Sequence, residues 1–304
     1  MYDIIIIGAG PAGLTAAIYA RRALKKTLVL EALTYGGQIV NASVIENYPT
    51  EKKISGVDFS NKLFEQAKDL GMEYINARVL DIIDHQDYKE VVTKNTTYQT
   101  KTVIIATGNE NRKLNIENEE NLIGKGISYC ATCDGMFYKD MEVAVVGGGN
   151  TSLKYALYLS DIASKVYLIY RRDKLKGEEI EIQELLNRNN IEVIYNSNII
   201  KLNGNDMLES IELENTLQEK RVLNVSGLFI AIGKIPENEN FRKLINLDDK
   251  GYIIATEDCK TNIEGIFVAG DNRTKSLRQL VTATSDGAVA ATEAIKYLRN
   301  LKWV

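Results

Sequence analysis

The sequence predicts an α/β fold of two domains, the second inserted into the first. A glycine-rich turn between an apolar run and an Ala-rich segment occurs at residues 8–13, and the same design recurs at residues 147–152. A later apolar run at 265–269 leads into an Ala-rich helix at about 277–298 and would complete the first domain. Two copies of a strand, a glycine turn and a helix are typical of Rossmann-like dinucleotide-binding domains.

The length of the chain supports this division. The 304 residues are enough for two domains of ordinary size, each with its own core. We expect the first domain to comprise residues 1–112 and 245–304, and the second to comprise residues 113–244.

The composition excludes several classes of protein. The chain has 37 Lys and Arg against 41 Asp and Glu, so its net charge of −4 gives no overall electrostatic reason to bind nucleic acid. The longest apolar run near the start, residues 4–7, is too short for a signal peptide or a membrane span. We therefore expect a cytoplasmic protein that has no membrane partner.

The first domain begins with a βαβ unit. The β-branched run at 2–7 predicts a strand buried on both faces, and the turn at 8–13 leads into a helix over 14–22. A second apolar run at 27–30 ends in Glu31. This order of elements is that of a nucleotide-binding start rather than of a glycine turn that serves packing alone.

The residues of this unit fit a dinucleotide. Gly8 permits a tight bend, Gly10 lets the backbone approach a pyrophosphate, and Gly13 lets the helix pack closely on the strand. Glu31 would accept hydrogen bonds from ribose hydroxyls and repel a 2′-phosphate. The first site is therefore expected to hold FAD or NAD.

The second glycine turn carries different flanking charges. Its candidate nucleotide-binding residues are Gly147, Gly149, Asn150 and Thr151. The strand predicted at 166–170 is followed by Arg171, Arg172 and Lys176, and arginine side chains match phosphate geometry. This cluster favours NADPH over NADH, with a solvated basic loop as the alternative.

Two cysteines suggest redox chemistry. Cys130 and Cys133 are spaced as a C-x-x-C pair, which brings two thiols within disulfide reach, and Asp134 could deliver a proton to a departing thiolate. A structural zinc site needs four ligands, and the only further candidates, Cys259 and His85, are isolated in the sequence. We therefore expect no metal. We expect Cys259 to be a plain thiol in an exposed loop.

With these features, the chain resembles the low-molecular-weight, bacterial-type thioredoxin reductases of the pyridine nucleotide-disulfide oxidoreductase family. The resemblance covers nearly the whole chain. Its motifs are Gly8-Ala9-Gly10-Pro11-Ala12-Gly13, Gly36-Gly37-Gln38, Glu46-Asn47-Tyr48-Pro49, Ala106-Thr107-Gly108, Cys130-Ala131-Thr132-Cys133-Asp134-Gly135, Gly147-Gly148-Gly149-Asn150-Thr151, Ala269-Gly270-Asp271 and Arg278-Gln279.

The resemblance implies a homodimer that carries FAD in the first domain and passes electrons from NADPH to thioredoxin. It implies that Cys133 lies nearer the flavin, that Cys130 attacks the thioredoxin disulfide and that Asp134 is the general acid. Arg278 and Gln279 are expected on the last helix, against the flavin. The residues it assigns to FAD beyond the first turn are Gly36, Gly37, Gln38, Asn47, Thr107, Gly108, Gly270, Asp271, Arg278 and Gln279.

Departures from the family pattern fall in the second nucleotide site. Ser152 replaces the usual Ala, Lys154 and Tyr155 replace paired acids, and Tyr170 and Lys176 replace His and Arg. Some relatives have lost NADPH binding and take electrons from reduced ferredoxin, so ferredoxin is the alternative donor and a possible partner. A scaffold that keeps two dinucleotide folds for packing alone would need no cysteine pair, which argues against it.

Overall fold

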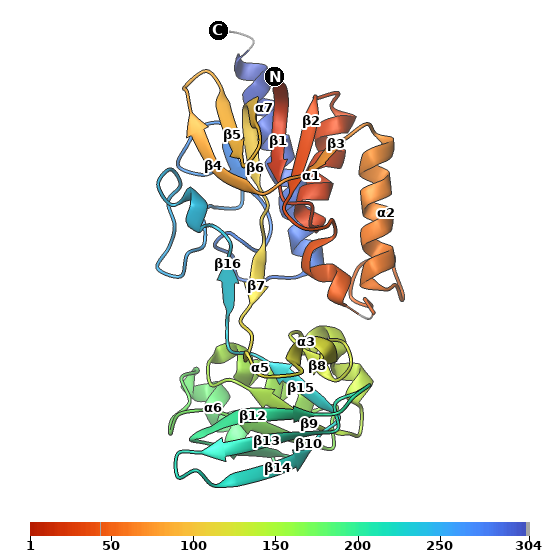
Figure 1. Ribbon diagram of the computed structural model, residues 1–304, viewed down its shortest axis with the longest axis vertical. Helices are drawn as coiled ribbons and strands as arrows, with labels where there is room; N and C mark the ends of the chain where they lie inside the picture. Colours follow the sequence, from red (N-terminus) through yellow and green to blue (C-terminus); the bar gives the residue numbers. More distant parts are fainter. Residues whose placement is uncertain (43, 302–304) are drawn as a thin grey trace. The chain divides into compact units, whose positions relative to one another are not determined.

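The computed structural model describes residues 1–42 and 44–301, and the chain forms two compact units (Figure 1). The first unit comprises Met1–Val40, Ile45–Glu110 and Ile235–Val304, and the second Asn41–Val44 and Asn111–Lys234. The second unit therefore ends before residue 244, where the sequence placed the boundary. The physical reason is that Phe241 and Ile245 are buried in the core of the first unit.

The first unit is built on a seven-stranded sheet. Its central strands run in the order β3-β2-β1-β6-β5-β4, and β17 pairs with the end of β6. The parallel strands are β1 (Tyr2–Ile7), β2 (Thr27–Glu31), β3 (Glu73–Asn76), β6 (Thr97–Ile105) and β17 (Ile266–Val268). The antiparallel strands are β4 (Val79–Asp84) and β5 (Lys89–Thr93).

Helices of the first unit pack against this sheet. They are α1 (Pro11–Arg22), α2 (Gly56–Asp69) and α7 (Leu280–Asn300), with short 3₁₀ turns η1 (Gly37–Asn41) and η3 (Glu239–Phe241). Alternate residues of β1 enter different cores: Ile4 and Ile6 pack with α1 and α7, whereas Ile5 and Ile7 pack on the opposite face. Burial on both faces explains why β1 is apolar throughout.

Small residues bring α1 and α7 unusually close. A Cβ added to Gly287 of α7 would lie 2.2 Å from the backbone oxygen of Ala12 in α1. The Ala-rich composition of both helices thus reflects their contact, because larger side chains would hold the two backbones apart.

The second unit contains a five-stranded parallel sheet in the order β11-β10-β9-β15-β8. These strands are β8 (Ile127–Ser128), β9 (Glu142–Val146), β10 (Lys165–Ile169), β11 (Ile191–Ile194) and β15 (Gly227–Ile230). An antiparallel sheet is formed by β12 (Ser197–Asn203), β13 (Ser210–Asn215) and β14 (Lys220–Asn224). The helical segments are α3 (Glu119–Leu122), α4 (Ala131–Asp134), η2 (Gly135–Tyr138), α5 (Asn150–Ser160) and α6 (Glu179–Leu186).

Two parallel sheets, each entered through a strand, glycine turn and helix, confirm the predicted α/β class. The chain passes between the units through β7 (Asn109–Asn111) and β16 (Lys234–Pro236), which pair with one another. None of the helices within the described residues is long and apolar enough to cross a membrane.

Candidate active site

The first glycine turn has the geometry that a nucleotide phosphate requires. Gly8 has φ +107°, and a Cβ there would lie 2.3 Å from the backbone oxygen of Ala106, so only glycine fits. A Cβ on Gly13 would lie 1.9 Å from the oxygen of Gly8. Gly10 is the N-cap residue of α1 and supplies no side-chain cap, which leaves first-turn amides able to bind an anion.

Glu31 lies beside this turn. Its Oε2 accepts a hydrogen bond from the backbone N–H of Ala9 at 2.8 Å, and its Oε1 accepts one from the N–H of Leu33 at 2.9 Å. A carboxylate oxygen can accept more than one hydrogen bond, so both remain able to bind ribose hydroxyls. The two amides fix the orientation of the carboxylate before any ligand arrives.

Several residues assigned to FAD by resemblance lie around the same turn. The N–H of Gly36 donates to the oxygen of Ala9 at 2.8 Å, and a Cβ on Gly37 would lie 3.2 Å from Cα of Gly10. Gly108, after β6, has φ +71° and open space around its missing Cβ. The remaining neighbours assigned in this way are Thr107, partly buried beside Gly108, and Gln38, exposed in η1.

Asn47 and Gln279 come together although they are far apart in the sequence. The amide of Asn47 donates to Oε1 of Gln279 at 3.3 Å. Gln279 is the N-cap residue of α7, where it forms a capping box with Thr282. Because α7 begins at Leu280, both Gln279 and Arg278 precede the helix on which the sequence placed them.

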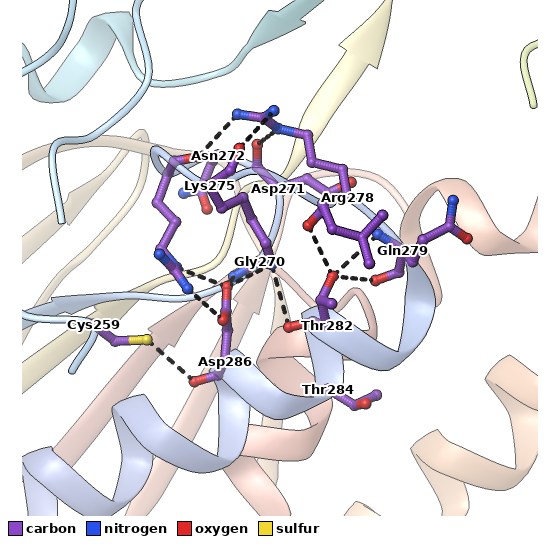
Figure 2. A network of polar contacts seen from close by, with 12 residues as sticks. Cys259, Gly270, Asp271, Asn272, Lys275, Arg278, Gln279, Thr282, Thr284 and Asp286 are labelled. Carbon is purple, nitrogen blue, oxygen red and sulfur yellow. Dashed lines mark hydrogen bonds and ion pairs between the residues drawn. The ribbon is translucent and has the colours of Figure 1, made fainter. Parts of the chain in front are cut away.

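Arg278 is used to hold the loop between β17 and α7 (Figure 2). Its guanidinium donates to the backbone oxygens of Asp271, Lys275 and Arg273 at 3.3, 3.2 and 3.1 Å. It also lies 4.1 Å from the ring centroid of Tyr252. Three carbonyl acceptors fix the backbone of the loop that carries Asp271, immediately after the positive-φ residue Gly270.

The prediction for Cys259 was wrong. This residue is fully buried, and its thiol lies 3.8 Å from the backbone oxygen of Asp286 in α7. Burial raises the pKa of the Cys259 thiol to about 12, so it is a protonated core side chain at neutral pH. Across residues 1–42 and 44–301, no group of three His, Cys, Asp or Glu side chains could hold a metal ion.

The second glycine turn repeats the geometry of the first. Gly147 has φ +143°, and a Cβ there would lie 2.4 Å from the backbone oxygen of Ala231. Gly149 is the N-cap residue of α5, supplies no side-chain cap and has open space around its missing Cβ. Asn150 and Thr151 form the exposed start of α5.

The basic loop after β10 folds back onto this turn. The N–H of Lys176 donates to the backbone oxygen of Gly148 at 2.7 Å, while Arg171, Arg172 and Lys176 remain exposed. Tyr170 packs closely on the turn, since a Cβ on Gly148 would lie 2.3 Å from its ring. A loop with three exposed cations therefore adjoins a turn whose amides can bind phosphate.

Cys130 and Cys133 form a disulfide, with their Cα atoms 5.3 Å apart. The short helix α4 places them together, because the backbone oxygen of Cys130 accepts hydrogen bonds from the N–H groups of Cys133 and Asp134 at 3.2 and 3.1 Å. The predicted redox pair and its neighbouring acid thus occupy a single turn of the second unit.

The side chain of Asp134 is partly buried and takes part in a hydrogen-bond network. Its Oδ2 accepts a hydrogen bond from the Ser128 hydroxyl at 2.6 Å, and that hydroxyl accepts one from the N–H of Cys130 at 3.0 Å. Its Oδ1 is buried and has no hydrogen-bond partner among the described residues. Burial raises the pKa of Asp134, and the bond from Ser128 only partly offsets this.

Sequence reasoning missed the residues that hold the segment before Cys130. Ser128 joins Asp134 to the backbone of Cys130, as described above, and the hydroxyl of Tyr155 donates to the oxygen of Tyr129 at 3.0 Å. The Tyr129 hydroxyl donates to the buried carboxylate of Glu119 at 2.8 Å. Isolated polar residues of this kind carry no motif that a single sequence would reveal.

Comparisons with known proteins agree with this geometry. The family model described as pyridine nucleotide-disulphide oxidoreductase matches residues 2–287. The thioredoxin reductase of Listeria innocua is 43% identical over 304 residues, which cover 99% of this chain and 95% of the relative.

Solved structures show the same likeness. The crystal structure of thioredoxin reductase from Streptococcus pyogenes is 38% identical, covers 99% of both chains and has a TM-score of 0.94. The structure of a ferredoxin-flavin thioredoxin reductase from Clostridium acetobutylicum is 30% identical, covers 98% of both chains and has a TM-score of 0.54.

Proposed function

Because the chain belongs to the pyridine nucleotide-disulphide oxidoreductase family, as a low-molecular-weight thioredoxin reductase, we propose that it reduces the disulfide of thioredoxin with electrons from NADPH. FAD and the Cys130–Cys133 pair would carry the electrons between donor and acceptor. The observation that carries this proposal is the disulfide itself, held in one turn with a carboxyl whose pKa is raised.

The first unit has the residues that FAD would need. The uncapped start of α1, the open backbone at Gly10 and the preoriented Glu31 fit the pyrophosphate and ribose of an adenine dinucleotide. When bound, FAD supplies a centre that accepts two electrons and transfers them to a disulfide. Asp271, Gln279 and Asn47 are the side chains that we assign to the rest of the cofactor.

The proton of Asp134 has a defined place in this proposal. Its Oδ2 accepts a hydrogen bond from the Ser128 hydroxyl, and that hydroxyl accepts a hydrogen bond from the backbone N–H of Cys130. Oδ1 is therefore the oxygen that is left to carry the proton. Reductive cleavage of the disulfide gives a thiolate and requires a proton donor. A carboxylic acid with a raised pKa, in the same turn as both cysteines, is suited to that task.

The cysteines then perform thiol–disulfide exchange. The Cys130 thiolate would attack one sulfur of the thioredoxin disulfide, forming a mixed disulfide and releasing the other thioredoxin sulfur as a thiolate, which takes a proton. Attack by Cys133 on the sulfur of Cys130 would release the second thioredoxin thiolate and restore the Cys130–Cys133 disulfide. Two electrons and two protons thus reach thioredoxin in each cycle.

The second unit supports NADPH as the electron donor. Arg171, Arg172 and Lys176 are exposed beside the second glycine turn, where they would bind the 2′-phosphate, and the uncapped start of α5 would bind the pyrophosphate. The departures seen in the sequence do not remove these features. Ser152 is fully buried and donates to the oxygen of Gly149, so it fits the place of the usual Ala.

Reduced ferredoxin is the second candidate donor. Tyr170 packs on Gly148 of the glycine turn, and the exposed side chain of Lys154 pairs with Glu181 at 3.5 Å. A related solved structure is described as a ferredoxin-flavin thioredoxin reductase. These three observations are the specific support for a donor other than NADPH.

Anaerobic stopped-flow absorbance separates the two donors. Oxidised holoenzyme mixed with NADPH should lose its flavin absorbance within seconds, should respond far more weakly to NADH, and should then reduce thioredoxin. Bleaching by reduced ferredoxin, with no response to NADPH, would replace the proposed donor. A Cys133→Ser variant that still reduces thioredoxin at the full rate would overturn the role of the disulfide.

We also propose that the protein is a cytoplasmic homodimer, as the resemblance implies. Sedimentation equilibrium of the holoenzyme should give twice the chain mass of 34.0 kDa. A concentration-independent mass of one chain would contradict the dimer without affecting the proposed reaction.

A further inference from the structure

A cluster of buried charges lies at the start of α7, outside the residues assigned above (Figure 2). Asp286 is 5% exposed, and its carboxylate pairs with Arg273 and Lys275, whose side chains are 3% and 5% exposed. Arg273 donates through Nε to Oδ2 and through Nη2 to Oδ1, both at 2.8 Å. Lys275 donates to Oδ2 at 2.9 Å.

All the partners of this carboxylate belong to one loop. Besides Arg273 and Lys275, the backbone N–H of Gly270 donates to Oδ2 of Asp286 at 3.0 Å. The loop between β17 and α7 is therefore tied to the helix by one backbone amide near its start and by two later side chains. Lys275 also donates to the backbone oxygen of Thr282, within the first turn of α7.

A second set of bonds holds the same loop from the opposite direction. Arg278 binds the carbonyl oxygens of Asp271, Arg273 and Lys275, as described above. Asp286 thus binds two side chains and one backbone amide of the loop, while Arg278 binds three of its backbone carbonyls. Both sets of bonds hold the backbone at Asp271, since Gly270 binds Asp286 and the carbonyl of Asp271 binds Arg278. Asp271 is the residue that the proposed function assigns to FAD.

The need to fill space in the core does not explain why Asp286, Arg273 and Lys275 are charged residues. Apolar residues of similar size would fill the same space without the cost of removing three ions from water. Burial alone would raise the pKa of Asp286, but the bonds from Arg273 and Lys275 hold it below its ordinary value, so the carboxylate is ionised. An ionised, fully bonded carboxylate gives a loop one backbone arrangement rather than several.

We propose that Asp286 is a positioning residue for the FAD site, acting through Gly270, Arg273 and Lys275 to fix the loop that carries Asp271 and Gln279. This inference rests on the proposed function, since it assumes that FAD binds the first unit. Asp286 itself need not touch the cofactor. Its removal should therefore alter how tightly FAD binds and how easily the bound flavin is reduced.

The test compares Asp286→Asn with Glu293→Gln. Glu293 is the matched control, because it also lies on α7 and also pairs with two lysines, Lys260 and Lys296, but none of its partners is in the loop. Apoprotein of each variant is titrated with FAD, and the midpoint potential of the bound flavin is measured. Neither readout depends on thioredoxin or NADPH.

Asp286→Asn should weaken FAD binding by about tenfold or more, because bonds to a charged acceptor are lost and the loop is released. It should also make the flavin easier to reduce, since Arg273 and Lys275 would lose their compensating negative charge. Glu293→Gln should match the wild type in both readouts.

Wild-type FAD affinity and potential in Asp286→Asn would overturn the inference, even if the variant melts at a lower temperature. If Asp286→Asn does not fold, Lys275→Met is the deciding variant, because it keeps the Arg273–Asp286 pair. It should weaken FAD binding by a smaller factor, and because it removes a positive charge it should make the bound flavin harder to reduce. No change in folded Lys275→Met would then count against the inference. Failure of the wild-type protein to bind FAD would instead refute the proposed function.

Discussion

The two glycine turns share the same steric constraint on the backbone but have different surroundings. Gly8 and Gly147 both have positive φ, and a Cβ on either would collide with the backbone oxygen of Ala106 or Ala231 at 2.3 or 2.4 Å. Both helices that follow begin without a side-chain cap. The strand ends differ, because β2 ends in Glu31 whereas β10 is followed by arginines and lysines.

This comparison separates two tasks within one motif. The glycines and the helix start provide the phosphate site, which is the same for every dinucleotide. The charge at the end of the second strand decides between a free ribose and a 2′-phosphate. Substitutions at Gly8 and Gly147 should therefore abolish binding at their own turns, and substitutions at the strand ends should change selectivity.

The largest effect is expected from Gly8→Ala. Its Cβ would meet backbone that cannot move aside and φ would be strained, which should destabilise the first unit by about 3 kcal/mol or more and prevent FAD binding. Gly147→Ala has the same clash in the other turn and should lose NADPH reduction while remaining yellow. Flavin absorbance of the purified variants, before and after mixing with NADPH, checks both, and equal flavin content would contradict the separate roles of the turns.

Removal of both arginines in Arg171→Ala/Arg172→Ala should weaken NADPH binding by roughly a hundredfold, because each charged hydrogen bond contributes about 1.5 kcal/mol or more. Binding of NADH should change little, since it has no 2′-phosphate. Rates of flavin reduction at varied nucleotide concentration give both values. Arg188→Ala, an exposed arginine of the same unit paired with Asp161 and Glu184, is the control.

Ser128→Ala should move the pH profile of thioredoxin reduction. The Ser128 bond lowers the pKa of Asp134, so its loss should raise that pKa further. The protonated acid would then persist to higher pH, and the alkaline limb of the profile should move upward. Ser160→Ala, which removes a buried hydroxyl bonded to Leu157 in the same unit, should leave the profile in place.

The smallest effect is expected from Gly149→Ala. This position has φ −105°, and nothing lies within 4 Å of the added Cβ, so the fold should change by less than about 1 kcal/mol. Thermal unfolding beside Gly147→Ala measures the difference. Similar losses of stability in both variants would show that the open space at Gly149 does not matter.

The sequence predicts the elements whose signal is local. Both βαβ starts, the cysteine pair and the inserted arrangement follow from apolar runs, glycines and their order. The start of α7 was placed three residues early, at Leu277 instead of Leu280, because the capping box of Gln279 and Thr282 has no apolar periodicity to reveal it.

Residues that act through distant partners could not be predicted. Cys259 stands between two charged residues in the sequence and reads as exposed, but tertiary packing buries it beneath α7. Ser128 and Asp286 acquire their roles only when folding brings Asp134 and the loop after β17 to them. A hydrogen bond between segments leaves no spacing or composition that one sequence can show.

The close contact of α1 with α7 at Gly287 has a consequence for biosynthesis. A ribosome makes β1, α1 and β6 before the second unit, yet β17, which completes their sheet, and α7, which covers it, are made after the second unit. All strands of the second unit have been made by then, so this unit can fold while the first is still waiting for its final segments. Insertion of the flavin would accordingly wait until α7 has been made.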